Sequence, residues 1–250
     1  MEAILLQLRA DDKTSDARAK RVKEFLSKHT AEVDLVVLPE LWQHGIPDFS
    51  TCKEKAETLT GKTAGFLSKQ ARALSAYLIG GSIIEKHRGK LYNTSPVFDP
   101  NGQMISIYRK RHLTSYHSHE SKVLSPGNDT QVITTPFAKI GLAICYDLRF
   151  PMLFKDLVLA GAEVLVVPAA WPMTRMEAWE SLCRARAVEN QAYLIACGTA
   201  GGGLLGRSMI VDPWGVKVAS LGEQEGVLKA TLNLEQLREF RRELKAWREH

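Results

Sequence analysis

Residues 139 to 151 read KIGLAICYDLRFP and carry an apolar run into a polar turn and then a proline. The run from Ile140 to Ile144 is apolar nearly throughout, which is typical of a strand buried on both faces of a sheet. Cys145 ends the run, and Pro151 predicts the start of a helix, because proline suits the first helical position. A buried cysteine is usually inert packing, whereas a thiol at a strand end with a base nearby is a candidate nucleophile.

Apolar runs alternate with amphipathic segments along all 250 residues. Buried strands are predicted from apolar runs at 3–8, 33–39, 76–84, 139–145, 162–170 and 192–200. Amphipathic helices are predicted at 15–29, 62–75, 151–160 and 174–189. Segments 91–110 and 206–232 read as strand pairs joined by the turns Asp-Pro-Asn-Gly and Asp-Pro-Trp-Gly, and their likeness suggests a duplicated strand-helix-hairpin unit. We therefore expect an α/β fold with mixed sheets and helices outside, in one domain over 1–250, since no Pro/Gly/Ser-rich linker divides the chain.

Charge and cysteine usage exclude several classes of protein. The net charge is +5, and the charges are spread except in YRKRH (108–112) and in the segment from 238 to 250. Such runs are usually solvated, so we expect no nucleic-acid partner. The amino terminus lacks the features of a signal peptide, and no segment reaches the roughly 20 apolar residues that span a bilayer. The four cysteines show neither CxxC pairing nor ligand-spaced histidine, which indicates a cytoplasmic protein without a metal site or disulfide framework.

Three polar residues follow predicted strands at the edge where α/β sheets bind ligands. Glu40 comes after a strand-ending proline, Lys110 after an alternating strand, and Cys145 after the run described above. Each has a structural interpretation on its own, as a loop cap, a solvated base or a core residue. Together they make a complete set, because a carboxylate can take the proton of a thiol and an ammonium can stabilise an oxyanion. No histidine lies in a partner motif for Cys145, which argues against a cysteine-histidine design.

Three ordered motifs resemble the catalytic motifs of the nitrilase superfamily, the carbon-nitrogen hydrolases. They are LPELW at 38–42, YRKRHL at 108–113 and CYDLRFP at 145–151. The resemblance extends over essentially the whole chain through ESKVLSPGN at 120–128 and WESLCRARAVENQAYLIACG at 179–198. It implies a four-layer αββα sandwich that forms a homodimer.

The resemblance also implies roles for four residues. Glu40 is expected to be the general base, Lys110 the oxyanion stabiliser and Cys145 the nucleophile. Glu120 matches a second glutamate that lines the site and positions the lysine. Such a triad requires no cofactor and no metal.

Within the superfamily, CYDLRFP and PAAWP (168–172) look most like the ω-amidase branch. The chain departs from its relatives at Ala170, where many have Asn or Gln, and at Asn128, which replaces an aspartate. The expected activity is hydrolysis of a small amide, an ω-amide of a dicarboxylic or 2-oxo acid, through a cysteine thioester. A nitrilase, an N-carbamoyl-amine hydrolase or an amide-forming acyltransferase would use the same triad. Outside catalysis, a silent binding protein of this fold and a nucleic-acid or anion binder using RKRH stay open.

Further residues are candidates for the substrate pocket. The backbone N–H of Tyr146 is expected to help Lys110 at the oxyanion. Arg149, Arg111 and His112 are candidates for holding a substrate carboxylate, although a structural pair with Asp147 is favoured for Arg149.

Several other features have competing interpretations. Trp42 and Trp171 fit either a pocket wall or the core. The histidine-bearing segment HLTSYHSHES (112–121) fits a mobile loop over the site better than a metal site. The glycines of CGTAGGGLLGRS (197–208) have the letter pattern of a dinucleotide loop, but a strand pattern follows them instead of a helix, so we predict a loop near the pocket.

Overall fold

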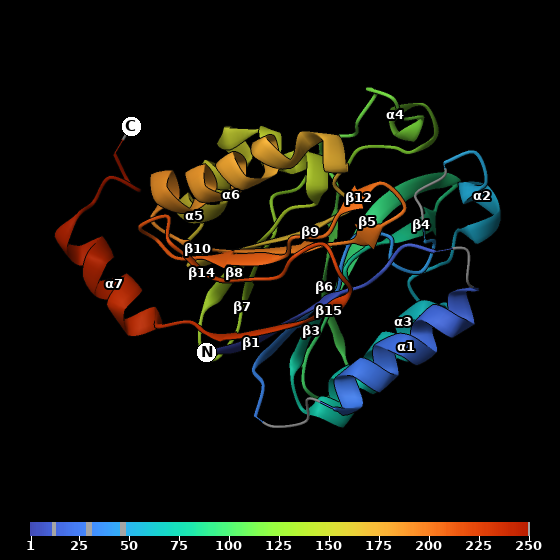
Figure 1. The fold of residues 1–250 in the computed structure, drawn as a ribbon, viewed down its shortest axis with the longest axis horizontal. Coiled ribbons are helices and arrows are strands. Elements are labelled where there is room, and N and C mark those ends of the chain that lie inside the picture. The colour runs from blue at the N-terminus through green and yellow to red at the C-terminus, as the bar shows by residue number, and fades with distance from the viewer. Residues whose placement is uncertain (12–13, 29–31, 46–48, 250) are drawn as a thin grey trace.

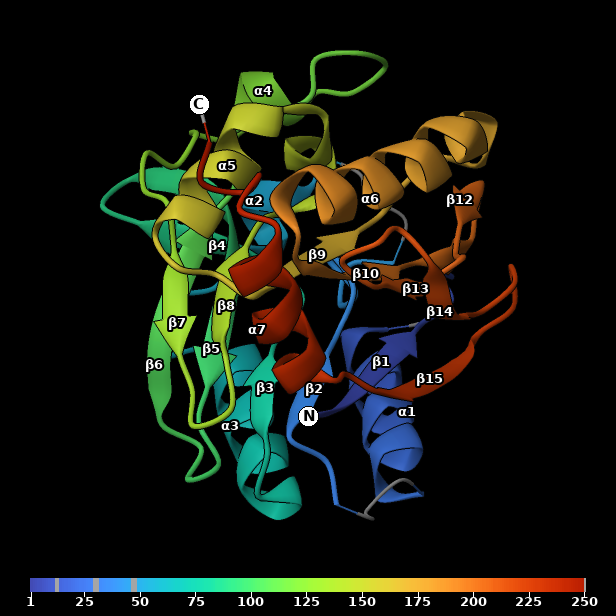
Figure 2. The same ribbon diagram turned by 90° about the vertical axis from the view of Figure 1, so that its left-hand side faces the viewer.

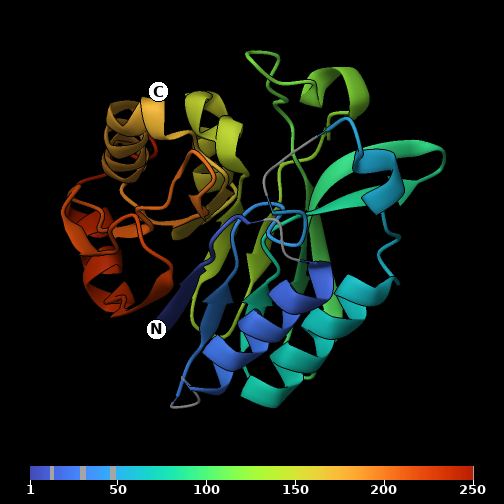
Figure 3. The ribbon, with the colours of Figure 1, turned by 45° about the vertical axis from the view of Figure 1, so that its right-hand side comes forward.

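The computed structural model consists of two mixed β-sheets packed face to face, each covered on its outer side by helices (Figures 1 and 3). It describes residues 1–11, 14–28, 32–45 and 49–249. Figure 1 shows the four layers in the order helix, sheet, sheet, helix, which confirms the expected αββα arrangement. No helix in these described ranges is long and apolar enough to cross a membrane.

The first sheet has the strand order β15-β1-β2-β3-β5-β4, with β6 pairing to β5. Its strands are β1 (Glu2–Gln7), β2 (Leu35–Val37), β3 (Tyr77–Ile79), β4 (Ile83–His87), β5 (Lys90–Phe98), β6 (Met104–Arg109) and β15 (Gly226–Thr231). The helices α1 (Ser15–Ser27) and α3 (Lys62–Leu74) cover its outer face.

The second sheet has the order β14-β13-β10-β9-β8-β7. Its strands are β7 (Val132–Thr134), β8 (Lys139–Leu142), β9 (Val164–Ala169), β10 (Tyr193–Gly198), β13 (Met209–Val211) and β14 (Lys217–Ser220). The helices α5 (Pro151–Leu159) and α6 (Met176–Asn190) cover it. One further helix, α7 (Leu234–Glu243), lies at one end of the molecule and faces the viewer in Figure 2. The opposite end carries the short elements α2 (Cys52–Lys55), α4 (Glu120–Val123), β11 (Ala200–Gly201) and β12 (Leu204–Leu205).

Five strands of each sheet follow one topological pattern. In both β1-β2-β3-β5-β6 and β8-β9-β10-β13-β14, the first two pairings are parallel and the next two are antiparallel. A helix follows the first strand of each set, and a hairpin with the expected Asp-Pro turn ends each set. This shared order is what a duplicated strand-helix-hairpin unit would produce.

The central strands are apolar on both faces because each face is covered. Successive side chains of a strand point to opposite sides of the sheet. Leu5 and Val37 accordingly pack into the core between the sheets, whereas Ile4, Leu6 and Val36 pack against α1 and α3. This double burial explains the near-continuous apolar runs from which the strands were predicted.

The structure departs from the sequence-based prediction in several places, including the following three. The strand predicted at 139–145 ends at Leu142, and a 3-10 turn at Cys145–Arg149 follows two residues later. The run at 76–84 is two strands, because the chain turns at Gly80 and Gly81 between β3 and β4. The helix α7 was not predicted: it begins at Leu234, before the charged run at 238–250, and continues into that run to Glu243, with Leu234 and Leu237 buried on one face.

Gly81 is the tightest backbone approach next to the carboxyl end of β2. It has φ +67°, and a Cβ atom built there would lie 1.9 Å from the carbonyl oxygen of Pro39. Only glycine combines this left-handed conformation with such proximity.

We predict that Gly81→Ala lowers the free energy of unfolding by more than roughly 3 kcal/mol, because the overlap with Pro39 adds to the strain of positive φ. The matched control is Gly89→Ala, at φ +76° with open space around it, which should cost only about 1 kcal/mol. Urea unfolding of both variants measures the difference. Equal losses would mean that the contact with Pro39 contributes nothing.

Candidate active site

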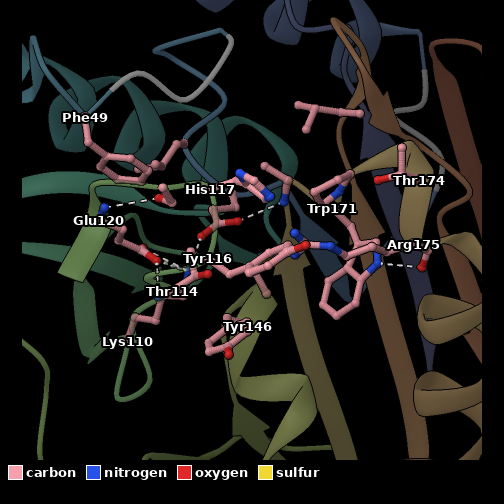
Figure 4. A pocket seen from close by; sticks show the side chains of 17 residues that line it. Phe49, Lys110, Thr114, Tyr116, His117, Glu120, Tyr146, Trp171, Thr174 and Arg175 are labelled. Atoms are coloured by element: carbon pink, nitrogen blue, oxygen red, sulfur yellow. Dashed lines mark hydrogen bonds and ion pairs between the residues drawn. The ribbon is translucent and has the colours of Figure 1, made fainter.

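A pocket of about 340 Å³ opens where β2, β6, β8 and β9 end (Figure 4). Each of these ends contributes a lining residue: Glu40 follows β2, Lys110 follows β6, Cys145 follows β8, and Trp171 follows β9. The other lining residues are Leu41, Phe49, Thr114, Tyr116, His117, Ser118, Glu120, Tyr146, Ala170, Pro172, Thr174, Arg175 and Leu204. The structure therefore brings the three residues singled out at strand ends into one cavity.

A buried ionic cluster occupies one wall of the pocket. The Nζ of Lys110 lies 2.9 Å from Oε1 of Glu40 and 2.9 and 3.0 Å from the two carboxylate oxygens of Glu120. All three residues are buried. Buried charges are tolerated when they are paired and their remaining hydrogen-bonding capacity is satisfied.

Two backbone amides and the side chain of Asn93 also donate hydrogen bonds to the carboxylate oxygens of Glu40 and Glu120. The amide of Ala170 donates to Oε2 of Glu40 at 2.8 Å, and the amide of Thr114 donates to Oε2 of Glu120 at 2.9 Å. The Nδ2 of Asn93 donates to Oε1 of Glu40 at 2.8 Å and to Oε1 of Glu120 at 3.1 Å. Asn93 thus ties the two glutamates together from the side.

Asn93 is a site residue that the sequence analysis missed. It lies on β5, and its carbonyl oxygen accepts the backbone amide of Lys110 at 2.9 Å, so the β5–β6 hairpin itself places the amide side chain beside the lysine. The available signal was an asparagine in a strand, where this residue type is disfavoured without a specific partner.

The backbone around Lys110 is fixed by a close contact with the SPGN segment. The amide of Gly127 donates to the carbonyl oxygen of Lys110 at 2.9 Å. A Cβ atom at Gly127 would lie 2.2 Å from the carbonyl oxygen of Arg109, so the segment can approach this closely only with glycine. The lysine therefore enters the pocket from a constrained strand end.

Cys145 begins its 3-10 turn with φ +45°, which is uncommon for a residue other than glycine. Asp147 supports this turn: its Oδ2 accepts from the amide of Ile144 at 3.0 Å and from the hydroxyl of Tyr108 at 2.7 Å. Because of this turn, the Cys145 thiol lies beyond the end of β8 and is hydrogen-bonded to Glu40.

The charges of the cluster set the protonation states. Burial raises the pKa of the Cys145 thiol well above its ordinary value, and the charge of Glu40 raises it further against the opposing effect of Lys110. Burial alone would raise the pKa of Glu40, but the charge and hydrogen bond of Lys110, together with hydrogen bonds from Cys145 and the Ala170 amide, lower that pKa. Burial alone would lower the pKa of Lys110, yet Glu120 and Glu40 raise it well above its ordinary value. At neutral pH Cys145 is therefore a thiol, Glu40 a carboxylate and Lys110 an ammonium.

The cations proposed for a substrate carboxylate lie outside the pocket lining. The Arg149 guanidinium stacks 5.1 Å over the Trp171 ring, and among the described residues it makes no ion pair with Asp147. Arg111 hydrogen-bonds to Thr130, and His112 binds Asp147 with its Nδ1 at 2.7 Å.

The two tryptophans with open interpretations divide between core and pocket. Trp42 is packed in the core with its Nε1 donating to the Gly80 carbonyl, whereas Trp171 and Tyr146 line the pocket. The loop with histidines contributes Tyr116 and His117 to the lining. Throughout the described part of the chain, no group of three or more His, Cys, Asp or Glu residues is arranged to hold a metal ion.

The glycine-rich segment forms the short hairpin β11–β12 and then leads into β13, not into a helix. Its Leu204 lines the pocket, as a loop near the site should. Arg175, which also lines the pocket, was not among the residues predicted from the sequence.

Comparison with known proteins gives one consistent family. Residues 5–242 match the family model described as carbon-nitrogen hydrolase. A protein named 2-oxoglutaramate amidase from Paenarthrobacter nicotinovorans is 36% identical over 236 residues, which cover 90% of this chain and 80% of that protein. Omega-amidase NIT2 from Homo sapiens is 36% identical over 259 residues, covering 98% and 93%. The crystal structure of Saccharomyces cerevisiae Nit3, described as a member of branch 10 of the nitrilase superfamily, superposes with a TM-score of 0.90 at 32% identity, covering 98% of this chain and 94% of that one.

Proposed function

The chain belongs to the carbon-nitrogen hydrolase family, and from that premise we propose that it hydrolyses the terminal amide of a short dicarboxylic or 2-oxo acid to a carboxylate and ammonia. The observation that carries the proposal is the buried contact of Cys145, Glu40 and Lys110 in one pocket. The names of the relatives, 2-oxoglutaramate amidase and omega-amidase, support an amide as the substrate.

The first step is attack of the Cys145 sulfur on the amide carbonyl carbon. The thiol is neutral in the resting site because its pKa is raised, so the proton must leave as the new bond forms. Glu40, already hydrogen-bonded to the thiol, is the acceptor. General base catalysis of this kind contributes typically about 10²- to 10⁴-fold to the rate.

The carbonyl oxygen becomes an oxyanion in the tetrahedral intermediate. Lys110 supplies a positive charge beside it, and the backbone N–H of Tyr146 is the second donor in the proposal. When Glu40 takes the thiol proton it becomes neutral, and the oxyanion replaces it as a counter-charge of the lysine. The total charge around Lys110 is therefore conserved through the step.

Collapse of the intermediate breaks the carbon-nitrogen bond. Glu40 returns its proton to the departing nitrogen, so ammonia leaves and a thioester remains on Cys145. A water molecule that gives its proton to Glu40 then attacks the thioester. The carbon-sulfur bond breaks, the Cys145 sulfur takes the proton back from Glu40, and the product acid is released. Glu120 and Asn93 hold Lys110 and Glu40 in register throughout, and the scheme uses neither cofactor nor metal.

We predict that Cys145→Ala and Glu40→Gln fold normally but lose at least roughly 10²-fold in ammonia release, because one removes the nucleophile and the other the proton acceptor. Cys52→Ala, Cys183→Ala and Cys197→Ala are the matched controls and should keep most of the activity. A panel of monoamides of diacids, neutral amides, N-carbamoyl amines and nitriles is the assay. Activity on nitriles or carbamoyl amines alone would replace the amidase proposal with one of those activities, and no activity on any substrate would favour a silent binding protein.

We predict an unusually wide pH range for kcat/KM on a neutral amide such as butanamide, which has no titrating group of its own. Catalysis needs the Glu40 carboxylate, so activity is present above the pKa of Glu40 and is lost as the pH falls through it. Because Lys110 lowers that pKa, the acid limb should lie below about pH 4.3, the ordinary value for glutamate. An acid limb above pH 5, in enzyme whose circular dichroism is still native, would contradict this.

We also propose that residues 1–250 form a single cytoplasmic domain that assembles as a homodimer. The family match over 5–242 supports one domain, and the four cysteines, which show no CxxC spacing, are compatible with a reducing compartment. Cell fractionation that finds the protein outside the cytoplasm would contradict this location.

For the dimer, the outer helix layer carries exposed apolar side chains, with Met152 67% and Leu159 45% exposed on α5 and Val188 47% exposed on α6. We predict that light scattering at micromolar concentration gives twice the chain mass of 27.8 kDa. A monomer mass would remove the dimer.

A further inference from the structure

In the part of the chain that the structure describes, two lysine or arginine side chains line the pocket, Lys110 and Arg175, and they differ in their partners. Lys110 is hydrogen-bonded to Glu40 and Glu120 and is buried within the cluster. Arg175 also lines the pocket, but no carboxylate among the described residues lies within ion-pair distance of its guanidinium. In Figure 4, Arg175 lies with Trp171 and Thr174 on the side of the view away from Lys110 and Glu120.

Arg175 is held by a network of short-range contacts rather than by a counter-charge. It ends the 3-10 turn Met173–Arg175, in which its amide donates to the carbonyl oxygen of Pro172 at 3.0 Å. The indole Nε1 of Trp171 donates to the carbonyl oxygen of Arg175 at 2.9 Å. The amide of Met173 binds the carbonyl oxygen of Gly203 at 2.9 Å, which ties the turn to the β11–β12 hairpin. The backbone that presents the guanidinium is thus fixed on both sides.

The side chain of Arg175 is oriented by an aromatic ring. Its Cζ lies 4.7 Å from the centroid of Tyr116, a lining residue that comes from the loop with histidines. The guanidinium and the ring make a cation–π contact. The N–H groups of a guanidinium lie along the edge of its plane, in a fork that matches a planar acceptor with two oxygens.

We infer that Arg175 is the residue that binds the carboxylate at the far end of the substrate and selects short linear monoamides of diacids. The inference rests on the proposed amidase function and deepens it. One end of such a molecule presents its amide to Cys145, and the other end carries a carboxylate that forms a fork-shaped pair with Arg175. Within the described ranges of the chain, Arg175 has no acidic partner in the pocket. The carboxylate of a diacid monoamide would supply that partner, whereas a neutral amide has no group that could.

The other cations near the site are placed less well for this role. Arg149 stacks on the Trp171 ring and does not line the pocket. Arg111 is directed to Thr130, and His112 is engaged with Asp147 and stacked 3.7 Å from the ring of Phe150. His117 does line the pocket, but an imidazole cannot form a two-point pair with a carboxylate in the way a guanidinium does.

The test is steady-state ammonia release from glutaramate and butanamide by wild type, Arg175→Gln and Arg175→Lys. Loss of a charge-assisted pair should raise KM for glutaramate roughly 10- to 100-fold in Arg175→Gln with kcat within about threefold. On butanamide, which has no carboxylate, kcat/KM should stay within about twofold of wild type. Arg175→Lys keeps the charge without the fork and should fall between the two.

A charge-matched control is Lys20→Gln, on the exposed outer face of α1, where the side chain is 79% exposed. It should leave both substrates unaffected. An equal loss on glutaramate and butanamide in Arg175→Gln would show a structural role and overturn the inference. A rise in KM for glutaramate in Arg149→Gln instead of Arg175→Gln would overturn it in favour of that residue.

Calorimetric titration of glutarate separates failure of this inference from failure of the proposed function. Wild type that binds glutarate, with binding weakened at least tenfold in Arg175→Gln, supports the carboxylate site whatever the outcome of the ammonia assay. Glutarate binding that is equal in the two proteins overturns the site even if the enzyme hydrolyses amides. An absence of ammonia release from every amide, with Arg175-dependent glutarate binding, overturns only the amidase function.

Discussion

The ammonium of Lys110 between the carboxylates of Glu40 and Glu120 is the interaction on which the rest of the site depends. Glu40 lies 70 residues from Lys110 in the sequence and Glu120 lies 10 residues from it, so two distant parts of the chain must meet to bury these three charges. Removing one partner of such a set typically costs about 3–5 kcal/mol, since the remaining charge is left without compensation in the interior. The cluster is thus costly to break. It also supplies the chemistry, because burial together with the charge of Glu40 raises the pKa of Cys145 and keeps the nucleophile protonated until Glu40 accepts the proton.

Backbone geometry, more than side-chain packing, places the members of this cluster. Gly81 lies against Pro39, one residue before Glu40, and Gly127 lies against Arg109, one residue before Lys110. Cys145 itself adopts positive φ. At each strand end the chain makes an approach or a turn that few residue types allow, and the positive φ of Cys145 places local backbone strain at the nucleophile.

The sequence predicted the framework and the reacting residues because both leave local signals. Strands covered on both sides read as continuous apolar runs, and the triad sits in three recognisable motifs at their ends. Asn93 could not be placed in the same way. Counting the β5–β6 pairing outward from its Asp-Pro turn puts Tyr92 opposite Lys110, but a register shift between Val97 and Phe98 moves Asn93 there instead. A shift of one residue exchanges the two faces of a strand, and nothing local in the sequence marks this one. Arg175 likewise looks like any helix-flanking cation until the pocket around it is seen.

The pairing of β1 with β15 has a consequence for how the molecule is made. The two strands pair antiparallel, in a register that runs from Glu2 opposite Thr231 to Gln7 opposite Gly226. The N-terminal amine also binds the carbonyl oxygen of Leu232. During translation, β1 can pair with β2 early, but its other edge stays open until more than two hundred further residues have left the ribosome. Translation adds about 5 to 20 residues per second, so this strand edge stays unpaired for roughly ten seconds or longer. Until β15 has been made, the open edge can pair with a wrong strand of the same chain or of another chain.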